Sequence, residues 1–385
     1  MTHSIRPILR SWLQHTPALD DFLRWLRRIF SACFFGLFRQ VAPSGVLWGP
    51  PKGFYSEYRL LQQGKVHGRL IISSQECPPL APGSLRKLCR LEQDGCQPWP
   101  VFWTRQHEVR LIGKSLVPLD AKKRLSLEGA FGPYNHLNDP TYRNLYLPKA
   151  LRLPGNWTSV VGQWGCVGYY HWFLDALPRL AMLPELPADT RVLVPPRLDS
   201  HQLDTLRWLG LEGRFRPTAE KHLLIENHYF CSPTSMTGCY NPFAVHFLRG
   251  AFLARADLDY NGPLRFYLKR VGKARPITNE PEVLEFFRRR GWGIVDTEAL
   301  TQAQQIRLFS QAEMICAPHG AGLSNLLWCQ PGCKVLELCA STFLNGVYEG
   351  LAQMVEANYR YLVFEGDGDY RSAIHLDAVA EALEF

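Results

Sequence analysis

Residues 314–325 read MICAPHGAGLSN, an apolar run that passes through a histidine and two glycines into a second apolar run. The first run has the length of a buried strand, and helical periodicity begins at Gly322. In an open α/β sheet, such a turn lies at the carboxyl end of a strand, where ligands bind. Backbone N–H groups and the helix N-terminus would favour an anion there. The turn therefore predicts a phosphate site, although a tight strand-to-helix turn without a ligand is the alternative.

The sequence on either side of this turn repeats the same alternation. Strands are predicted at 264–268, 293–296, 314–317, 334–338 and 359–364, and helices at 280–290, 301–312, 322–328 and 347–357. Strict alternation indicates a parallel sheet, because parallel neighbours need crossover connections. Residues 263–385 are therefore predicted to form a Rossmann-like lobe.

The rest of the chain gives a more mixed pattern. Strand-like runs at 69–73, 101–103 and 191–195 alternate with helix-like stretches, and 241–257 reads as a helix that ends before Asn261-Gly262-Pro263. A chain of 385 residues fits two domains. We expect an α/β protein with an N-terminal lobe at 43–262 and a separate arm at 1–42.

The arm is basic and aromatic. Residues 1–40 hold six arginines against two aspartates, so the arm carries about half of the formal net charge of +8. The uncharged run at 29–38 is too short to span a bilayer. This pattern predicts an amphipathic helix lying on a membrane surface, with a helix docked on the protein's own core as the alternative.

Eleven cysteines cannot all pair within the chain. Cys316 and Cys339 lie in apolar runs, where cysteine behaves as a small hydrophobe, so we expect a reducing compartment. Cys329, Cys333 and Cys339 lack a second pair that would complete a zinc site, and they are interpreted as core residues.

Charged residues surround the predicted phosphate site. Arg270 and Arg275 follow the first strand of the C-terminal lobe, where guanidinium groups could clamp a diphosphate. Glu337 interrupts an apolar run, and a buried acid needs a partner. We expect that partner to be a ribose diol, with a salt bridge to a core arginine as the alternative.

A second cluster lies at 168–179, which reads GYYHWFLDALPR. His171 and Asp175 are four residues apart and share one face of a helix. Such a pair can take a proton from a hydroxyl while each residue orients the other. A purely structural hydrogen-bonded pair is the alternative.

Together these motifs resemble glycosyltransferase family 61. The resemblance covers about 155–364 and depends on 169–175, Arg270, Arg275, Asn279-Glu280, 318–325 and 331–338 in this order. It implies a GT-B architecture of two facing Rossmann-like lobes and inverting transfer from a nucleotide-sugar without a metal or other cofactor. Known members use UDP-linked N-acetylglucosamine, xylose or arabinose, and the acceptor here would be a glycan or a lipid-linked glycan.

The resemblance also assigns roles. The donor side is expected to comprise Arg270, Arg275, His319, Gly320, Ala321, Gly322, Asn325 and Glu337. His171 and Asp175 are expected on the acceptor side, with Asp175 preferred as the base and His171 positioning it or the acceptor.

Other classes of protein fit less well. A serine hydrolase could use 319–322 as an oxyanion loop, but no G-x-S-x-G elbow follows. A metal-dependent GT-A transferase would need an Asp-x-Asp motif, which occurs at 257–259 and 367–369. A non-catalytic sugar-binding protein at a membrane also remains possible, whereas no nucleic-acid motif is present.

The sequence gives two expectations about location. The cysteines and the arm favour the inner face of a bacterial membrane and a role in surface polysaccharide or glycolipid synthesis. The triplet Asn156-Trp157-Thr158 is a formal N-glycosylation site, so the Golgi lumen is the alternative.

Overall fold

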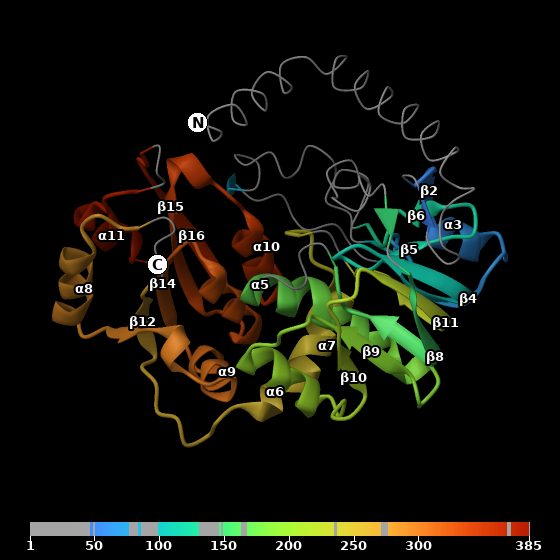
Figure 1. Cartoon of the computed structure of the whole chain (residues 1–385). Coiled ribbons are helices and arrows are strands. Elements are labelled where there is room, and N and C mark those ends of the chain that lie inside the picture. The colour runs from blue at the N-terminus through green and yellow to red at the C-terminus, as the bar shows by residue number, and fades with distance from the viewer. Residues whose placement is uncertain are drawn as a thin grey trace, which may run out of the picture.

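The computed structural model describes residues 47–48, 51–76, 84–85, 99–130, 146–147, 149–162, 168–234, 237–270, 276–367 and 371–384. The predicted arm and Arg275 lie outside these residues. Figure 1 shows two sheets, with the helices α5 (Tyr169–His171), α6 (Ser200–Trp208) and α7 (Pro242–Phe252) between them.

The C-terminal sheet is parallel throughout. In the described residues its order is β13 (Gly293–Val295), β12 (Arg265–Leu268), β14 (Met314–Pro318), β15 (Lys334–Ala340) and β16 (Asn358–Phe364). Between and after the strands lie α8 (Glu280–Arg289), α9 (Gln302–Ser310), the 3-10 helix η6 (Ala321–Trp328), α10 (Val347–Met354) and α11 (Leu376–Ala382). This is a doubly wound order, so the predicted alternation of strands and helices is confirmed.

The N-terminal sheet is only partly parallel. Its parallel strands lie in the order β10 (Phe215–Pro217), β9 (Arg191–Val194), β8 (Leu151–Ser159) and β11 (His222–Cys231). β4 (Val101–Ile112) continues the sheet antiparallel to β11, followed by β5 (Val117–Leu119), β6 (Arg124–Ser126) and β2 (Gly53–Tyr55), while β3 (His67–Ile72) pairs with β4. The prediction of a Rossmann-like lobe therefore holds for the parallel strands and is wrong for the remainder.

A short hairpin explains the antiparallel part. Only residues 113–116 separate β4 from β5, a connection too short for a parallel crossover. Gly113 and Leu116 take positive φ values of 77° and 49°, which let the chain reverse. α3 (Glu57–Gln62) packs against this part, and β1 (Leu47–Trp48) pairs separately with β7 (Tyr146–Leu147).

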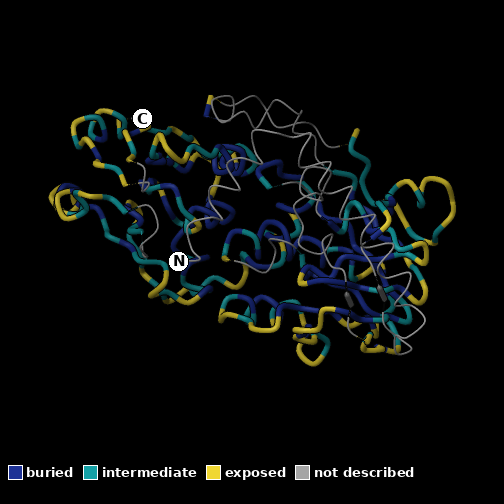
Figure 2. The backbone as a smooth tube through the Cα atoms, turned by 45° about the horizontal axis from the view of Figure 1, so that its top comes forward, coloured by how far each residue is buried: buried dark blue, intermediate teal, exposed yellow. Residues whose placement is uncertain are grey.

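One hydrophobic cluster joins the two sheets. Trp172 and Leu177 from the N-terminal half belong to the same buried cluster as Phe266, Leu323 and Trp328. The buried part of the trace accordingly runs through the middle of the molecule in Figure 2, with exposed residues at the outer turns. The lobes therefore share packing at their contact.

Helix α7 (Pro242–Phe252) strengthens this contact. Asn241 caps its first turn by accepting from Phe243 N, as the predicted start implies. The helix ends at Phe252, earlier than predicted, and a 3-10 turn follows at Leu253–Arg255. Arg249 Nη1 donates to the carbonyls of Leu327 and Cys329 at 2.6 and 2.8 Å and so closes the carboxyl end of η6.

The cysteines follow the expectation in part. Cys231, Cys316, Cys329, Cys333 and Cys339 are buried free thiols. Cys239, however, is disulfide-bonded, which the expectation of a reducing compartment does not account for. Cys239 lies on the connection between β11 and α7, and spacing along the sequence does not show which cysteine such a loop will meet. Among the described helices, none has the length and apolar character needed to cross a membrane.

Candidate active site

The C-terminal lobe has a pocket where its strand order reverses. β12 and β14 are neighbours there, and their carboxyl ends open between the connections to α8 and to η6. The pocket has a volume of about 150 Å³. It is lined by Leu268, Lys269, Arg270, Thr297, Glu298, Pro318, Gly320, Ala321 and Gly322. This is the position at which open α/β sheets bind ligands.

Two cationic side chains and a glycine-rich turn meet in this pocket. Arg270 Nη1 donates to the carbonyl of His319, which brings the guanidinium group against the turn. A Cβ atom at Gly320 would lie 2.8 Å from Arg270 Nη1, and one at Gly322 would lie 2.9 Å from Leu268 Cδ2. The absent side chains therefore allow close packing of strand, turn and arginine. With Lys269, the pocket suits an anion such as a diphosphate.

The His319 imidazole bonds to the buried carboxylate of Glu337. β14 and β15 pair with Ala317 opposite Glu337, so the glutamate reaches His319 from the neighbouring strand. His319 Nδ1 bonds to Glu337 Oε1, and Tyr359 Oη donates to Glu337 Oε2. Burial and then the glutamate charge raise the pKa of Tyr359, so the phenol stays protonated and donates.

This geometry changes the role of Glu337. Its side chain is 0% exposed, and both of its oxygens are engaged by protein groups. The core-arginine alternative is replaced by a histidine and a tyrosine. These contacts favour Glu337 as a group that orients His319, and its direct contact with the donor stays a prediction.

Asn325 is likewise part of the scaffold. Its side chain is fully buried and bonds to protein groups on three sides. Asn325 Nδ2 donates to Gln305 Oε1 at 2.9 Å and to Gly322 O at 3.2 Å. Asn325 Oδ1 accepts from Tyr169 Oη at 2.7 Å. This amide therefore ties the turn to the N-terminal half, and a direct contact of Asn325 with the donor stays a prediction.

The pair His171 and Asp175 lies at the corresponding place in the other lobe. α5 (Tyr169–His171) follows β8, whose neighbours β9 and β11 mark the reversal of strand order in the parallel part. The next turn, Trp172–Ala176, is a π-helix, a form often found at functional sites. His171 Nδ1 lies 2.6 Å from Asp175 Oδ2, which also accepts from Thr237 Oγ1 at 3.3 Å.

Exposure separates the roles of the two residues. The His171 side chain is 26% exposed, whereas that of Asp175 is 2% exposed. Burial raises the pKa of Asp175, and the bond from His171 opposes that rise. The geometry therefore favours His171 over Asp175 as the group that could meet an acceptor hydroxyl, with Asp175 bonded to its Nδ1.

A row of rings connects the two imidazoles. The Tyr170 ring lies 5.1 Å from that of His171 and 5.9 Å from that of Tyr348. The Tyr348 ring lies 5.1 Å from that of His319. The two histidines therefore lie on either side of one tyrosine pair, at the contact between the lobes.

The region that contains both histidines matches the model of a known protein family. Residues 169–336 match the family model described as Glycosyltransferase 61. The match begins at α5 and includes His171, Asp175, Arg270 and the turn at 319–322. This chain carries a glycosyltransferase 61 domain. No curated protein matches the chain.

The two sites also contain residues that the sequence did not single out. Lys269 and Glu298 line the pocket, while Thr237, Tyr348 and Tyr359 support the two histidines. Lys269 could have been found from its place directly after a predicted strand. The others depend on contacts between segments distant in sequence, which no local pattern reveals. Arg275 lies outside the described residues.

The Asp-x-Asp motifs lie elsewhere. Asp257 Oδ1 accepts from Asp259 N at 3.1 Å in a turn before β12, at the edge of the sheet opposite the pocket. Asp367 Oδ1 accepts from Arg371 N at 2.8 Å, and Asp369 is outside the described residues. In the described part of the chain, no three His, Cys, Asp or Glu side chains gather as metal ligands would.

Proposed function

We propose that this glycosyltransferase transfers a sugar from a UDP-sugar to a hydroxyl of a glycan or lipid-linked glycan, with inversion, in a GT-B arrangement. The single observation that carries the proposal is the position of the two sites. Each lies at the carboxyl ends of parallel strands in its own lobe, and Tyr170 and Tyr348 link them. A donor in one lobe and an acceptor in the other would then meet at their contact. Uridine is supported by the family resemblance alone.

The proposed chemistry needs no group beyond these side chains. Arg270, Lys269 and the backbone of the turn at 319–322 hold the diphosphate, which neutralises the charge that develops as it leaves. His171 takes the proton of the acceptor hydroxyl while that oxygen forms the new bond to the anomeric carbon. The bond from the anomeric carbon to the diphosphate breaks, and UDP leaves with the electron pair. Asp175 stabilises the imidazolium that forms.

The position of the proposed base supports inversion. His171 belongs to the N-terminal half, while the diphosphate pocket belongs to the C-terminal half. Attack would come from the face of the sugar opposite the leaving group. A non-catalytic sugar-binding protein would not need a partly exposed imidazole backed by a buried acid at this place.

The proposal is tested by binding and turnover together. Purified protein is incubated with a panel of UDP-sugars and glycan acceptors, and release of UDP is measured. Arg270→Ala should weaken UDP binding about tenfold or more, because a hydrogen bond to a charged group is lost. Arg216→Ala, on an exposed position of β10, is the matched control and should bind UDP normally. Unchanged UDP affinity in Arg270→Ala would refute the donor site.

We also propose that residues 1–40 attach the enzyme to an anionic membrane surface and that the lobes divide near residue 262. The two sheets take their strands from either side of that position. Deleting residues 1–40 should release the protein from anionic vesicles while leaving UDP binding intact. The disulfide at Cys239 supports an oxidising compartment such as the Golgi lumen over the bacterial cytoplasm. Asn156 itself lies within β8 and bonds to Asp189 Oδ1 at 2.8 Å.

A further inference from the structure

The pocket of the C-terminal lobe contains one acidic side chain. Glu298 lines the pocket beyond the end of β13, and Lys269 and Arg270 line it after β12. Within the described residues, its carboxylate makes no hydrogen bond or ion pair, and the residue is exposed. A carboxylate repels a diphosphate but accepts hydrogen bonds from paired hydroxyls. Glu298 therefore suits the ribose of a nucleotide, the ligand for which Glu337 is too deeply buried.

The turn that carries Glu298 is held in place by the protein. Glu298 N donates to Asp296 Oδ1 at 2.9 Å in the 3-10 turn Thr297–Ala299. Gln305 Nε2 donates to Thr297 O at 3.0 Å, and Gln305 Oε1 accepts from Asn325 Nδ2. The buried amides of Gln305 and Asn325 therefore fix the turn that carries Glu298 and the turn at 319–322 relative to each other, as a preorganised site requires.

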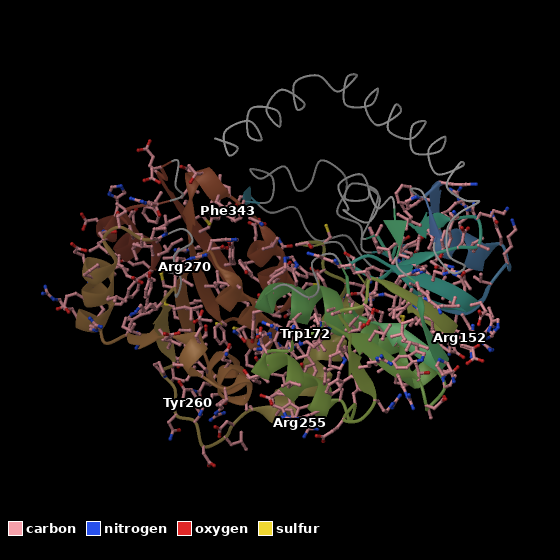
Figure 3. All side chains as sticks on the ribbon, in the orientation of Figure 1. Arg152, Trp172, Arg255, Tyr260, Arg270 and Phe343 are labelled. Carbon is pink, nitrogen blue, oxygen red and sulfur yellow. The ribbon has the colours of Figure 1, made fainter. Side chains whose placement is uncertain are left out.

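On the other side of the phosphate turn lies an exposed aromatic ring. Phe343 ends the 3-10 turn Ser341–Phe343 after β15 and is 38% exposed. Its ring centroid is 5.5 Å from that of His319, whose carbonyl accepts from Arg270. Figure 3 shows Phe343 and Arg270 on the same lobe. Gly366 N donates to Ser341 Oγ at 3.1 Å, so the turn presents the ring on a fixed backbone.

The position of the base gives the donor a direction. The anomeric carbon must lie between the diphosphate and His171, and the contacts from His319 to His171 run through Tyr348 of α10. α10 follows β15, on the side of Phe343 and away from β13. The sugar then extends towards Phe343, and the nucleoside extends towards Glu298.

We infer that Glu298 binds the ribose hydroxyls of the donor and that Phe343 packs against its sugar, so that the donor runs from the end of β13 to the end of β15. The inference rests on the proposed function. It assigns two residues to opposite halves of one ligand, and the halves can be tested separately.

The ribose half is tested by titrating UDP and 2′-deoxy-UDP by calorimetry. The unmodified protein should prefer UDP by about tenfold, the effect of one hydrogen bond to a charged group. Glu298→Ala should bind UDP about tenfold more weakly and lose this preference. Glu381→Ala, an exposed acid on α11, removes the same charge and should keep it. An intact preference for UDP in Glu298→Ala would overturn the assignment.

The sugar half is tested with UDP-N-acetylglucosamine or UDP-xylose, whichever binds more tightly. Phe343→Ala should leave UDP affinity unchanged and weaken binding of the UDP-sugar about tenfold, because apolar contact is lost. Leu258→Ala, another exposed apolar position, is the control and should change neither. Equal weakening of UDP and UDP-sugar in Phe343→Ala would reverse the orientation. If the unmodified protein binds no UDP, the proposed function fails; if Arg270→Ala alone weakens UDP, only this inference fails.

Discussion

The two lobes contain the same chemical pair in different surroundings. In each, a histidine Nδ1 bonds to a carboxylate oxygen, at His171 and Asp175 and again at His319 and Glu337. The side chains of the first pair are 26% and 2% exposed, and those of the second are 9% and 0% exposed. The first imidazole is therefore the more accessible of the two to a substrate. On the proposed function, exposure and not residue type separates the base from the positioning pair.

The strongest way to break this comparison is to remove the exposed imidazole. His171→Ala should lower kcat by about a hundred- to ten-thousand-fold, because the general base is lost. His246→Ala on the exposed side of α7 is the control and should turn over normally. Turnover near the wild-type rate in His171→Ala would move the base elsewhere.

The next largest effect concerns stability. Glu337→Ala should lower the free energy of unfolding by about 3 to 5 kcal/mol, because the substitution leaves the buried His319 imidazole without its carboxylate partner. Asp175→Ala should cost less, about 1 to 3 kcal/mol, because His171 can still be solvated. Urea unfolding of both variants checks this order. A larger loss in Asp175→Ala would show that the C-terminal pair is not the more deeply buried of the two in solution.

A third buried carboxylate, that of Glu57, extends the comparison, because no imidazole is among its partners in the described residues. Within the described residues, the Glu57 side chain accepts from Tyr55, Thr104 and Gln106, none of them basic. Burial raises its pKa from 4.5 to about 7. The folded state thus holds this proton more tightly than the unfolded state. The stabilisation is complete below pH 4.5 and declines as the pH rises to about 7, by roughly 3 kcal/mol in total.

Glu57→Gln should remove this decline. Unfolding free energies of the variant and the unmodified protein are compared at several pH values between about 4 and 8. The difference between the two proteins should change across the window in which Glu57 titrates. A constant difference would show that burial does not shift the Glu57 carboxyl.

The smallest expected effect on stability comes from Tyr359, which donates to the second oxygen of Glu337. Tyr359→Phe removes one hydrogen bond to Glu337 and should lower the free energy of unfolding by about 1 kcal/mol. Tyr361→Phe, two residues along the same strand, is the matched control. An effect in Tyr359→Phe no greater than in the control would mean that His319 alone supports the glutamate.

The same comparison shows what the sequence could predict. His171 and Asp175 lie four residues apart on a helix, so their contact followed from periodicity. His319 and Glu337 are eighteen residues apart, and their contact depends on the register of β14 and β15. The sequence therefore marked both residues but not their contact, because a pattern does not show that His319 and Tyr359 bond to the two oxygens of Glu337.

The fold could be predicted from the sequence for the C-terminal lobe but only in part for the N-terminal lobe. The C-terminal alternation gave each strand of the doubly wound sheet to within a few residues. The N-terminal sheet was not predictable in this way, because its antiparallel strands depend on a hairpin at 113–116 that has no strong turn signature. The place of Glu298 in the pocket could not be predicted, because an exposed acid in a short turn has no periodic signal in the sequence.

On the proposed function, the C-terminal pair serves donor binding and the N-terminal pair serves proton transfer. Titrating UDP into His319→Ala and His171→Ala by calorimetry tests this division directly. Binding should be about tenfold weaker in His319→Ala, because the turn and Arg270 lose their support, and unchanged in His171→Ala. Equal UDP affinity in the two variants, or weaker binding in His171→Ala alone, would contradict it.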